Sequence, residues 1–70
     1  MGLYTKIIEK DGTITTIKTQ ECMTGTYVMI NNDFAKVLCT EETEIDYHIR
    51  IRDQAIKRGA TISKYSSIIN

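Results

Sequence analysis

Two runs rich in β-branched residues, 3–9 and 13–19, flank the sequence Lys10-Asp11-Gly12. Asp-Gly between two such runs is the strongest short-range signal for a β-hairpin. We therefore expect a hairpin over about residues 3–19. A two-residue loop would pair Glu9 with Ile14, whereas a three-residue loop with a left-handed Gly12 would pair Ile8 with Ile14. We favour the second register because it matches two β-branched residues across the strands.

A second pair of such runs, at residues 24–30 and 34–39, is separated by Asn31-Asn32-Asp33. Asn accepts the left-handed backbone conformations that tight turns require, and Asx side chains bond to the nearby backbone. The pattern predicts a second antiparallel hairpin over about residues 24–39. Residues 20–23 would then connect the two hairpins within one small sheet.

Residues 43–52 fit two templates, a further strand or a helix. Apolar residues and Thr43 alternate with polar ones at ten consecutive positions, which is typical of a half-buried strand. As a helix, the segment would place Ile45, Ile49 and Ile56 on one stripe, with Thr40 as the cap. We favour the strand, followed by a short helical segment near 53–58. Residues 60–69 fit either a final strand or a short helix.

In the favoured register, both faces of the first hairpin carry apolar side chains. One face has Leu3, Ile7 and Ile17, and the other has Tyr4, Ile8 and Ile14. If one face points to water, these residues cannot all enter one core. Tyr4, Ile8 and Ile14 are therefore our candidate protein-interface residues.

Composition supports a β-rich α+β fold in a single small domain, residues 1–70. Twelve Ile, ten Thr and two Val make 24 of the 70 residues, against three Ala and two Leu. The longest uninterrupted apolar run is the four residues Tyr27-Val28-Met29-Ile30, too short for a membrane span or a signal-peptide core. We therefore expect a cytoplasmic protein without a membrane partner.

Cys22 and Cys39 lie 17 positions apart, without a CxxC pair and with a single histidine. The ligand set of a structural zinc site is therefore missing, and we expect no metal and no cofactor. In a reducing compartment we expect both thiols to be free and buried as small apolar residues. Without a disulfide or a metal, a chain this small gains its stability margin most readily from self-association or a partner protein.

Catalytic signals are weak. His48 has carboxylates nearby at Glu44 and Asp46, but no local motif places a nucleophile beside it. The distant candidate nucleophiles are Cys22, Cys39, Ser63, Ser66 and Ser67. The four glycines are isolated, so no phosphate-binding loop is present. We predict a protein that is not an enzyme and has no catalytic residues.

The chain is neutral overall but charged in blocks. Residues 33–46 hold five acidic residues against Lys36, a net charge of −4, and residues 47–70 hold five basic residues against Asp53, a net charge of +4. One interpretation is that the two segments neutralise each other, for example through Asp46 and Arg50. The other is a nucleic-acid surface. Its candidate contacts are Tyr47, Arg50, Arg52, Lys57, Arg58, Lys64 and Tyr65.

Two functions follow from this pattern. The first is a small non-enzymatic binding module acting through protein–protein contacts, as an inhibitor, regulator or accessory subunit. The abundance of Ile, Lys, Asn and Tyr in the chain is compatible with a gene from a phage or another mobile element. The alternative is a nucleic-acid-binding regulator that uses residues 47–65. For that alternative, a strand-like stretch at 36–40, Glu41-Glu42, a possible helix and residues 57–63 together loosely resemble the strand, helix, turn and second helix of ribbon-helix-helix repressors.

Overall fold

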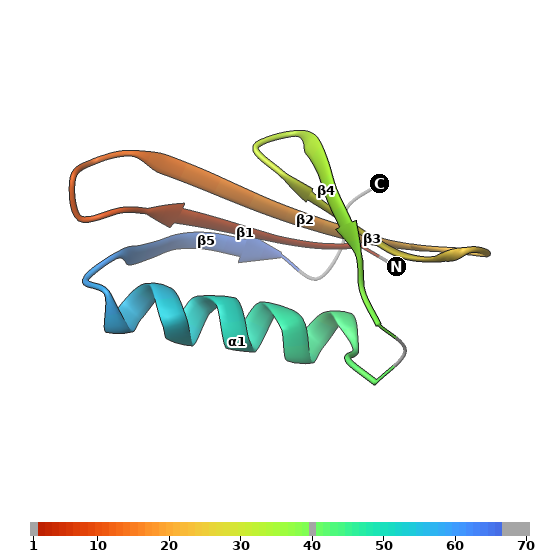
Figure 1. Cartoon of the computed structure of the whole chain (residues 1–70). Helices are drawn as coiled ribbons and strands as arrows, with labels where there is room; N and C mark the ends of the chain where they lie inside the picture. Colours follow the sequence, from red (N-terminus) through yellow and green to blue (C-terminus); the bar gives the residue numbers. More distant parts are fainter. Residues whose placement is uncertain (1, 40, 67–70) are drawn as a thin grey trace.

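One antiparallel sheet and one helix make up the fold (Figure 1). The computed structural model describes residues 2–39 and 41–66, with side chains as far as Ser63. The strands pair in the order β4-β3-β2-β1-β5, and α1 lies across one face of the sheet. The predicted β-rich α+β class is confirmed. In chain order the elements are β1 (Gly2–Ile8), β2 (Ile14–Cys22), β3 (Gly25–Ile30), β4 (Asp33–Val37), α1 (Glu44–Lys57) and β5 (Thr61–Ser66).

The turn between β1 and β2 is a three-residue loop with a left-handed glycine. The backbone N–H of Glu9 donates to the carbonyl of Thr13 over 2.7 Å, and Gly12 has a φ of 91°. The Asp11 carboxylate accepts from the N–H of Thr13 at 2.9 Å, which fixes the loop. Ile8 consequently lies opposite Ile14.

β2 is longer than the sequence indicated. It runs to Cys22, and its last three residues pair with the first three of β3. Residues 20–22 are therefore part of the ladder, and the prediction of residues 20–23 as a plain connection is wrong. The β-branched pattern ends at Thr19, but pairing with a strand on the same sheet extends the ladder through Gln20, Glu21 and Cys22.

The turn between β3 and β4 uses two left-handed asparagines. Asn31 and Asn32 have φ values of 52° and 70°, and Ile30 lies opposite Asp33. Positive φ at both central residues is the signature of a type I′ hairpin turn, for which Asn is among the preferred residues. The Asn31 side-chain oxygen also accepts from the backbone N–H of Thr16 at 2.9 Å, so this turn is tied to β2.

Residues 44–57 form a helix, so our preference for a strand at residues 43–52 is wrong, and the segment near 53–58 is its continuation. Thr43 is the N-cap, and its hydroxyl accepts from the N–H of Asp46 at 3.1 Å. Glu44 and Asp46 suit the positive N-terminal end of the helix dipole. The suggested cap, Thr40, lies outside the described residues.

The helix buries a different stripe from the one that isoleucines mark. Ile45, Ile49 and Ile56 are 58%, 43% and 58% exposed. The buried stripe is Glu44, Tyr47, His48 and Ala55, with Ile51 partly buried beside it. Two members of this stripe, Glu44 and His48, are polar. The spacing of apolar residues alone therefore did not indicate the helix.

The hydrophobic core lies between α1 and the sheet. It is built from Ile7, Ile17, Val28, Leu38, Tyr47, Ala55 and Ala60. From β4 at one edge, the chain crosses under the sheet as α1 and returns as β5 at the opposite edge, antiparallel to β1. Residues 60–69 were expected to form either a strand or a short helix, and residues 61–66 form the strand β5. Residues 67–69 lie outside the described residues. A strand rather than a second helix follows α1, so the resemblance to ribbon-helix-helix repressors does not extend to the fold.

Both cysteines are free and exposed, and the expectation that they are buried is wrong. Cys22 ends β2 beside a tight turn, and Cys39 lies in the connection to α1, so neither is at a position that the core covers. Within the described residues, no helix is long and apolar enough to cross a membrane.

Two isoleucines of the first hairpin test the assignment of the core. Ile7 is fully buried and Ile14 is 50% exposed. Ile7→Ala should lower the free energy of unfolding by about 2–5 kcal/mol, because it removes buried methyl groups and leaves a cavity. Ile14→Ala, the matched control, should cost less than about 1 kcal/mol. Urea denaturation followed by circular dichroism measures both, and equal losses would contradict this core.

Candidate functional site

A buried polar cluster joins α1 to the sheet. Thr5 of β1 and Thr19 of β2 are 0% and 1% exposed, and His48 and Glu44 of α1 are 5% and 7% exposed. The Thr5 Oγ1 lies 2.7 Å from His48 Nδ1, and the Thr19 Oγ1 lies 2.9 Å from His48 Nε2. The Thr19 hydroxyl also donates to Glu44 Oε2 at 2.7 Å. Four polar side chains are thus mutually satisfied inside the fold.

This network assigns the protons of a neutral His48. Because the Thr19 hydroxyl donates to Glu44, its oxygen accepts from Nε2–H of the imidazole. Nδ1 is then the acceptor for the Thr5 hydroxyl. Desolvation by burial lowers the pKa of His48 from 6.5 to about 4, with Arg52 adding a smaller effect in the same direction.

The cluster has a hydroxyl beside an imidazole, the pair that nucleophilic catalysis uses, but in a different arrangement. In a catalytic triad, the carboxylate orients the base through its second nitrogen. Here Glu44 bonds to the Thr19 hydroxyl, and the second nitrogen of His48 bonds to Thr5. Because Thr19 is 1% exposed, its oxygen does not face a substrate. The geometry therefore serves helix–sheet packing.

A half-open hollow of about 100 Å³ lies beside the cluster, at the start of α1. Its lining residues are Leu3, Glu21, Thr43, Glu44 and Ile45. Pockets for small molecules are usually 300–1,000 Å³, so this hollow is too small to enclose one. Among the described residues, no group of three His, Cys, Asp or Glu side chains is arranged to hold a metal ion.

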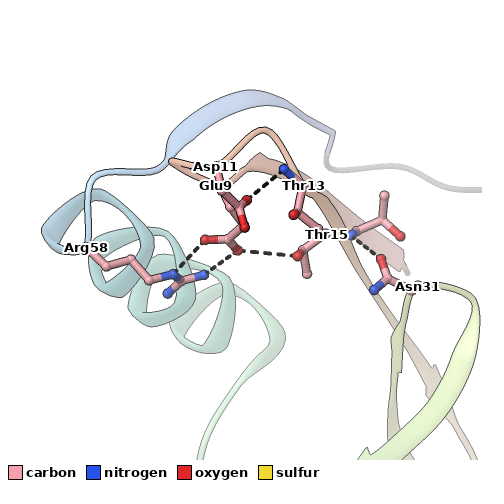
Figure 2. A network of polar contacts seen from close by, with 7 residues as sticks. Glu9, Asp11, Thr13, Thr15, Asn31 and Arg58 are labelled. Carbon is pink, nitrogen blue, oxygen red and sulfur yellow. Dashed lines mark hydrogen bonds and ion pairs between the residues drawn. The ribbon is translucent and has the colours of Figure 1, made fainter.

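Ion pairs on the helix side neutralise much of the basic half of the chain. Arg58 makes a bidentate contact with Glu9, both bonds at 2.9 Å, and Glu9 in turn accepts from Thr15 (Figure 2). Arg50 makes a similar contact with Glu42, at 2.9 and 3.1 Å, rather than with Asp46. Hydrogen bonds from the two guanidinium groups hold the pKa values of Glu9 and Glu42 below the ordinary value.

The predicted nucleic-acid contacts are spread over different places. Tyr47 is 3% exposed, and its ring contacts Lys36 and Arg50, whose charged groups lie 5.3 and 5.1 Å from its centroid. Lys57 is exposed in the last turn of α1, and Arg52 is partly buried in the same helix. Lys64 and Tyr65 lie in β5, opposite Lys6 and Thr5. Of the five whose side chains the structure describes, Tyr47 is buried and Arg50 and Arg58 are held in ion pairs, so these five do not form one free basic surface.

The predicted protein-interface residues do lie on one face, the side of the sheet opposite α1. No described element covers that side (Figure 1). Strand alternation and the observed registers define its members, which we call the open sheet face. They are Tyr4, Lys6 and Ile8 in β1, Ile14, Thr16, Lys18 and Gln20 in β2, Tyr27 and Met29 in β3, Phe34 and Val37 in β4, and Thr61 in β5.

Contacts and exposure support this placement. The rings of Tyr27 and Phe34, on neighbouring strands, meet edge to face with centroids 5.9 Å apart. Ile14, Phe34 and Val37 are 50%, 58% and 45% exposed. From β1 to β4, the face spans three strand spacings of about 4.8 Å and three two-residue steps of about 6.8 Å, a projected area of about 290 Å². Lys6, Thr16, Lys18 and Gln20 interrupt its apolar members, so the face combines apolar surface with two positive charges.

Sequence reasoning placed Glu44 near His48 but missed Thr5 and Thr19, and also the two lysines of the open sheet face. A signal for the threonines was available, because both occupy the alternation positions of buried Leu3, Ile7 and Ile17. No protein-family model matches the chain, and no similar curated protein or solved structure was found. The function is therefore inferred from the geometry of this chain.

The buried imidazole predicts a stability that falls on mild acidification. His48 has a pKa of about 4 in the folded protein and 6.5 as its ordinary value in the unfolded chain. As the pH falls through this window, the unfolded chain binds a proton that the folded protein does not, so the free energy of unfolding decreases. The full loss is about 3 kcal/mol, at about 1.4 kcal/mol per pKa unit. Urea denaturation at a series of pH values measures it.

The matched variant is His48→Gln, which cannot titrate. Between pH 7 and 5 its free energy of unfolding should vary less with pH than that of the wild type, whatever its absolute stability. Glu9 and Glu42 stay ionised in this range because their pKa values are lowered, and Glu44 and Arg52 are present in both proteins. Equal slopes for the two proteins would show that His48 titrates normally in the folded state.

Proposed function

We propose that this protein is a small non-enzymatic binding module that acts through protein–protein contacts, as an inhibitor, regulator or accessory subunit. The observation that carries the proposal is the open sheet face. One side of the sheet packs against α1, while the other presents exposed Ile14, Phe34 and Val37 and is covered by no described element. A partner protein that covers this face removes its apolar surface from water.

The anatomy of the face supports a specific contact. Tyr4, Tyr27, Met29 and Phe34 supply aromatic and methionine side chains, which are enriched at protein interfaces. They stand on paired strands, so their positions are set by the sheet and little backbone entropy is lost on binding. Lys6 and Lys18 lie among them and give the face a positive charge, which a partner has to complement.

The alternative of a nucleic-acid surface over residues 47–65 has less support. Its central ring, Tyr47, is buried against the core and cannot stack on a base. Arg50 and Arg58 are held by Glu42 and Glu9, so phosphate contacts would have to displace bidentate ion pairs. The acidic side chains of those pairs would also repel a phosphate backbone.

A photo-crosslinking residue placed on each side of the molecule tests the proposal. We expect p-benzoylphenylalanine in place of Tyr4, on the open sheet face, to form a discrete adduct with one partner protein in extracts of the source cells. The same residue in place of Gln54, which is exposed on α1, should form no such adduct. Gel electrophoresis and mass spectrometry of the adduct identify the partner.

Competition then locates the contact. Excess unlabelled wild-type protein should suppress the Tyr4 adduct, and so should Ile56→Asp, which places a charge at an equally exposed isoleucine of α1. Ile14→Asp should compete at least tenfold less well, because it puts a carboxylate on the contact surface. Adducts formed equally from position 54, or full competition by Ile14→Asp, would place any interface elsewhere.

A further inference from the structure

We propose that the partner presents to the open sheet face an acidic polypeptide segment in which two carboxylates are flanked by apolar side chains. This inference rests on the proposed function and specifies the chemistry of the partner. It comes from the arrangement of Lys6, Lys18 and the apolar residues on the sheet.

The described part of the open sheet face carries positive charge only. Lys6 and Lys18 stand in its middle. The acidic residues of the strands and their loops lie elsewhere: Glu9 contacts Arg58 under the sheet, Glu21 lines the hollow beside α1, and Asp33 is opposite the helix-side residue Ile30. The remaining described carboxylates are Asp11 in the first loop and those at or in α1. A chain with zero net charge is thus cationic on this one face.

This charge selects against a second copy of the chain as the occupant. Two identical open sheet faces brought together would bury lysines against lysines without a carboxylate between them. Desolvating an ammonium group without a counter-charge is costly, and like charges across an interface repel. A partner with carboxylates at the matching positions satisfies the same lysines, so charge complementarity favours an acidic partner.

The aliphatic residues of the face favour a polypeptide over a nucleic acid. Ile8 and Ile14 form one end of the face, and Met29 and Val37 belong to the other. Aliphatic side chains offer a base no ring to stack on, whereas they pack closely against apolar side chains of a protein. Tyr27 and Phe34 meet each other edge to face, and the arginines of described ion pairs, Arg50 and Arg58, lie on the helix side.

The registers give the spacing of the complementary segment. Lys6 lies opposite Thr16, and Lys18 is two residues further along β2, so the two lysines are diagonal neighbours with Cα atoms about 7–8 Å apart. In an extended segment, residues i and i+2 point the same way and are about 6.8 Å apart. Two acidic residues at i and i+2 therefore match Lys6 and Lys18.

Extending this line by one such step past Lys18 reaches Tyr27, with Val37 beside it on β4. One step past Lys6 reaches Thr61 of β5, with Ile8 beside it on β1, so an apolar side chain at either end of the segment has an apolar neighbour on the face. The predicted motif is a seven-residue extended segment with an apolar residue at positions 1 and 7 and an acidic residue at positions 3 and 5. Main-chain direction and the residues at positions 2, 4 and 6 are left open by this face.

Three capped peptides test the motif against the whole chain by NMR titration of the ¹⁵N-labelled protein. The acidic probe is Ile-Thr-Glu-Thr-Glu-Thr-Ile, and the controls carry Gln or Lys in place of both Glu residues. We expect the acidic probe to shift the amides of Lys6, Lys18 and their neighbours, with an affinity about tenfold higher than that of the Gln control and a response that weakens with salt. The Lys control should not bind.

Matched variants identify the lysines that matter. Lys6→Gln combined with Lys18→Gln should reduce the affinity for the acidic probe about tenfold, to that of the Gln control. Lys10→Gln combined with Lys57→Gln changes the net charge equally at exposed positions away from the face and should leave the affinity unchanged. Circular dichroism confirms that both double variants are folded.

Other outcomes overturn the inference. Equal affinity for the acidic and Gln probes, or no binding by the acidic probe at millimolar concentration, removes the acidic motif, while a Tyr4 photo-adduct with a protein would still support the proposed function. A dimer in sedimentation that Ile14→Asp dissociates would make a second copy the occupant. Binding of a single-stranded oligo(dT) probe that Lys6→Gln with Lys18→Gln abolishes would contradict both the inference and the proposed function.

Discussion

The contact between α1 and the sheet depends on four buried polar side chains that satisfy one another's hydrogen bonds. Thr5 and Thr19 stand on adjacent strands at positions where the alternation calls for apolar residues, and His48 and Glu44 face them from the helix. A buried hydroxyl or imidazole without a partner costs about 1–3 kcal/mol. The network is therefore directional, because a helix shifted by one residue would leave several of these groups unpaired.

The same cluster explains which parts of the structure could be predicted from the sequence. The Asp-Gly and Asn-Asn turns are local signals, because the backbone conformation they require is carried by the residues themselves. The helix is not local in this sense. Its buried stripe includes Glu44 and His48, which look like solvent-facing residues until Thr5 and Thr19, far away in the chain, are known to oppose them. The alternation of apolar and polar residues at 43–52 therefore resembled that of a half-buried strand.

For the candidate interface, by contrast, local register predicted several of the residues. Tyr4, Ile8 and Ile14 could be placed on a common face from register alone, because a strand's period of two is exact and the hairpin loop fixes which residues are opposite. Lys6 and Lys18 were not singled out, since their meaning depends on where the carboxylates are. Only the fold shows that Glu9 and Glu21 lie on the helix side, so that the described residues of the open sheet face include these lysines and no carboxylate.

The crossing path of α1 has a consequence for how the sheet is protected. The first four strands pair with sequence neighbours, but β1 acquires its second neighbour only when β5 arrives from the far end of the chain. Without β5, β1 is an edge strand with a row of unpaired backbone groups, and without α1 the side chains of Ile7 and Ile17 are uncovered. Residues 44–66 therefore protect the hairpins that precede them from pairing with another chain.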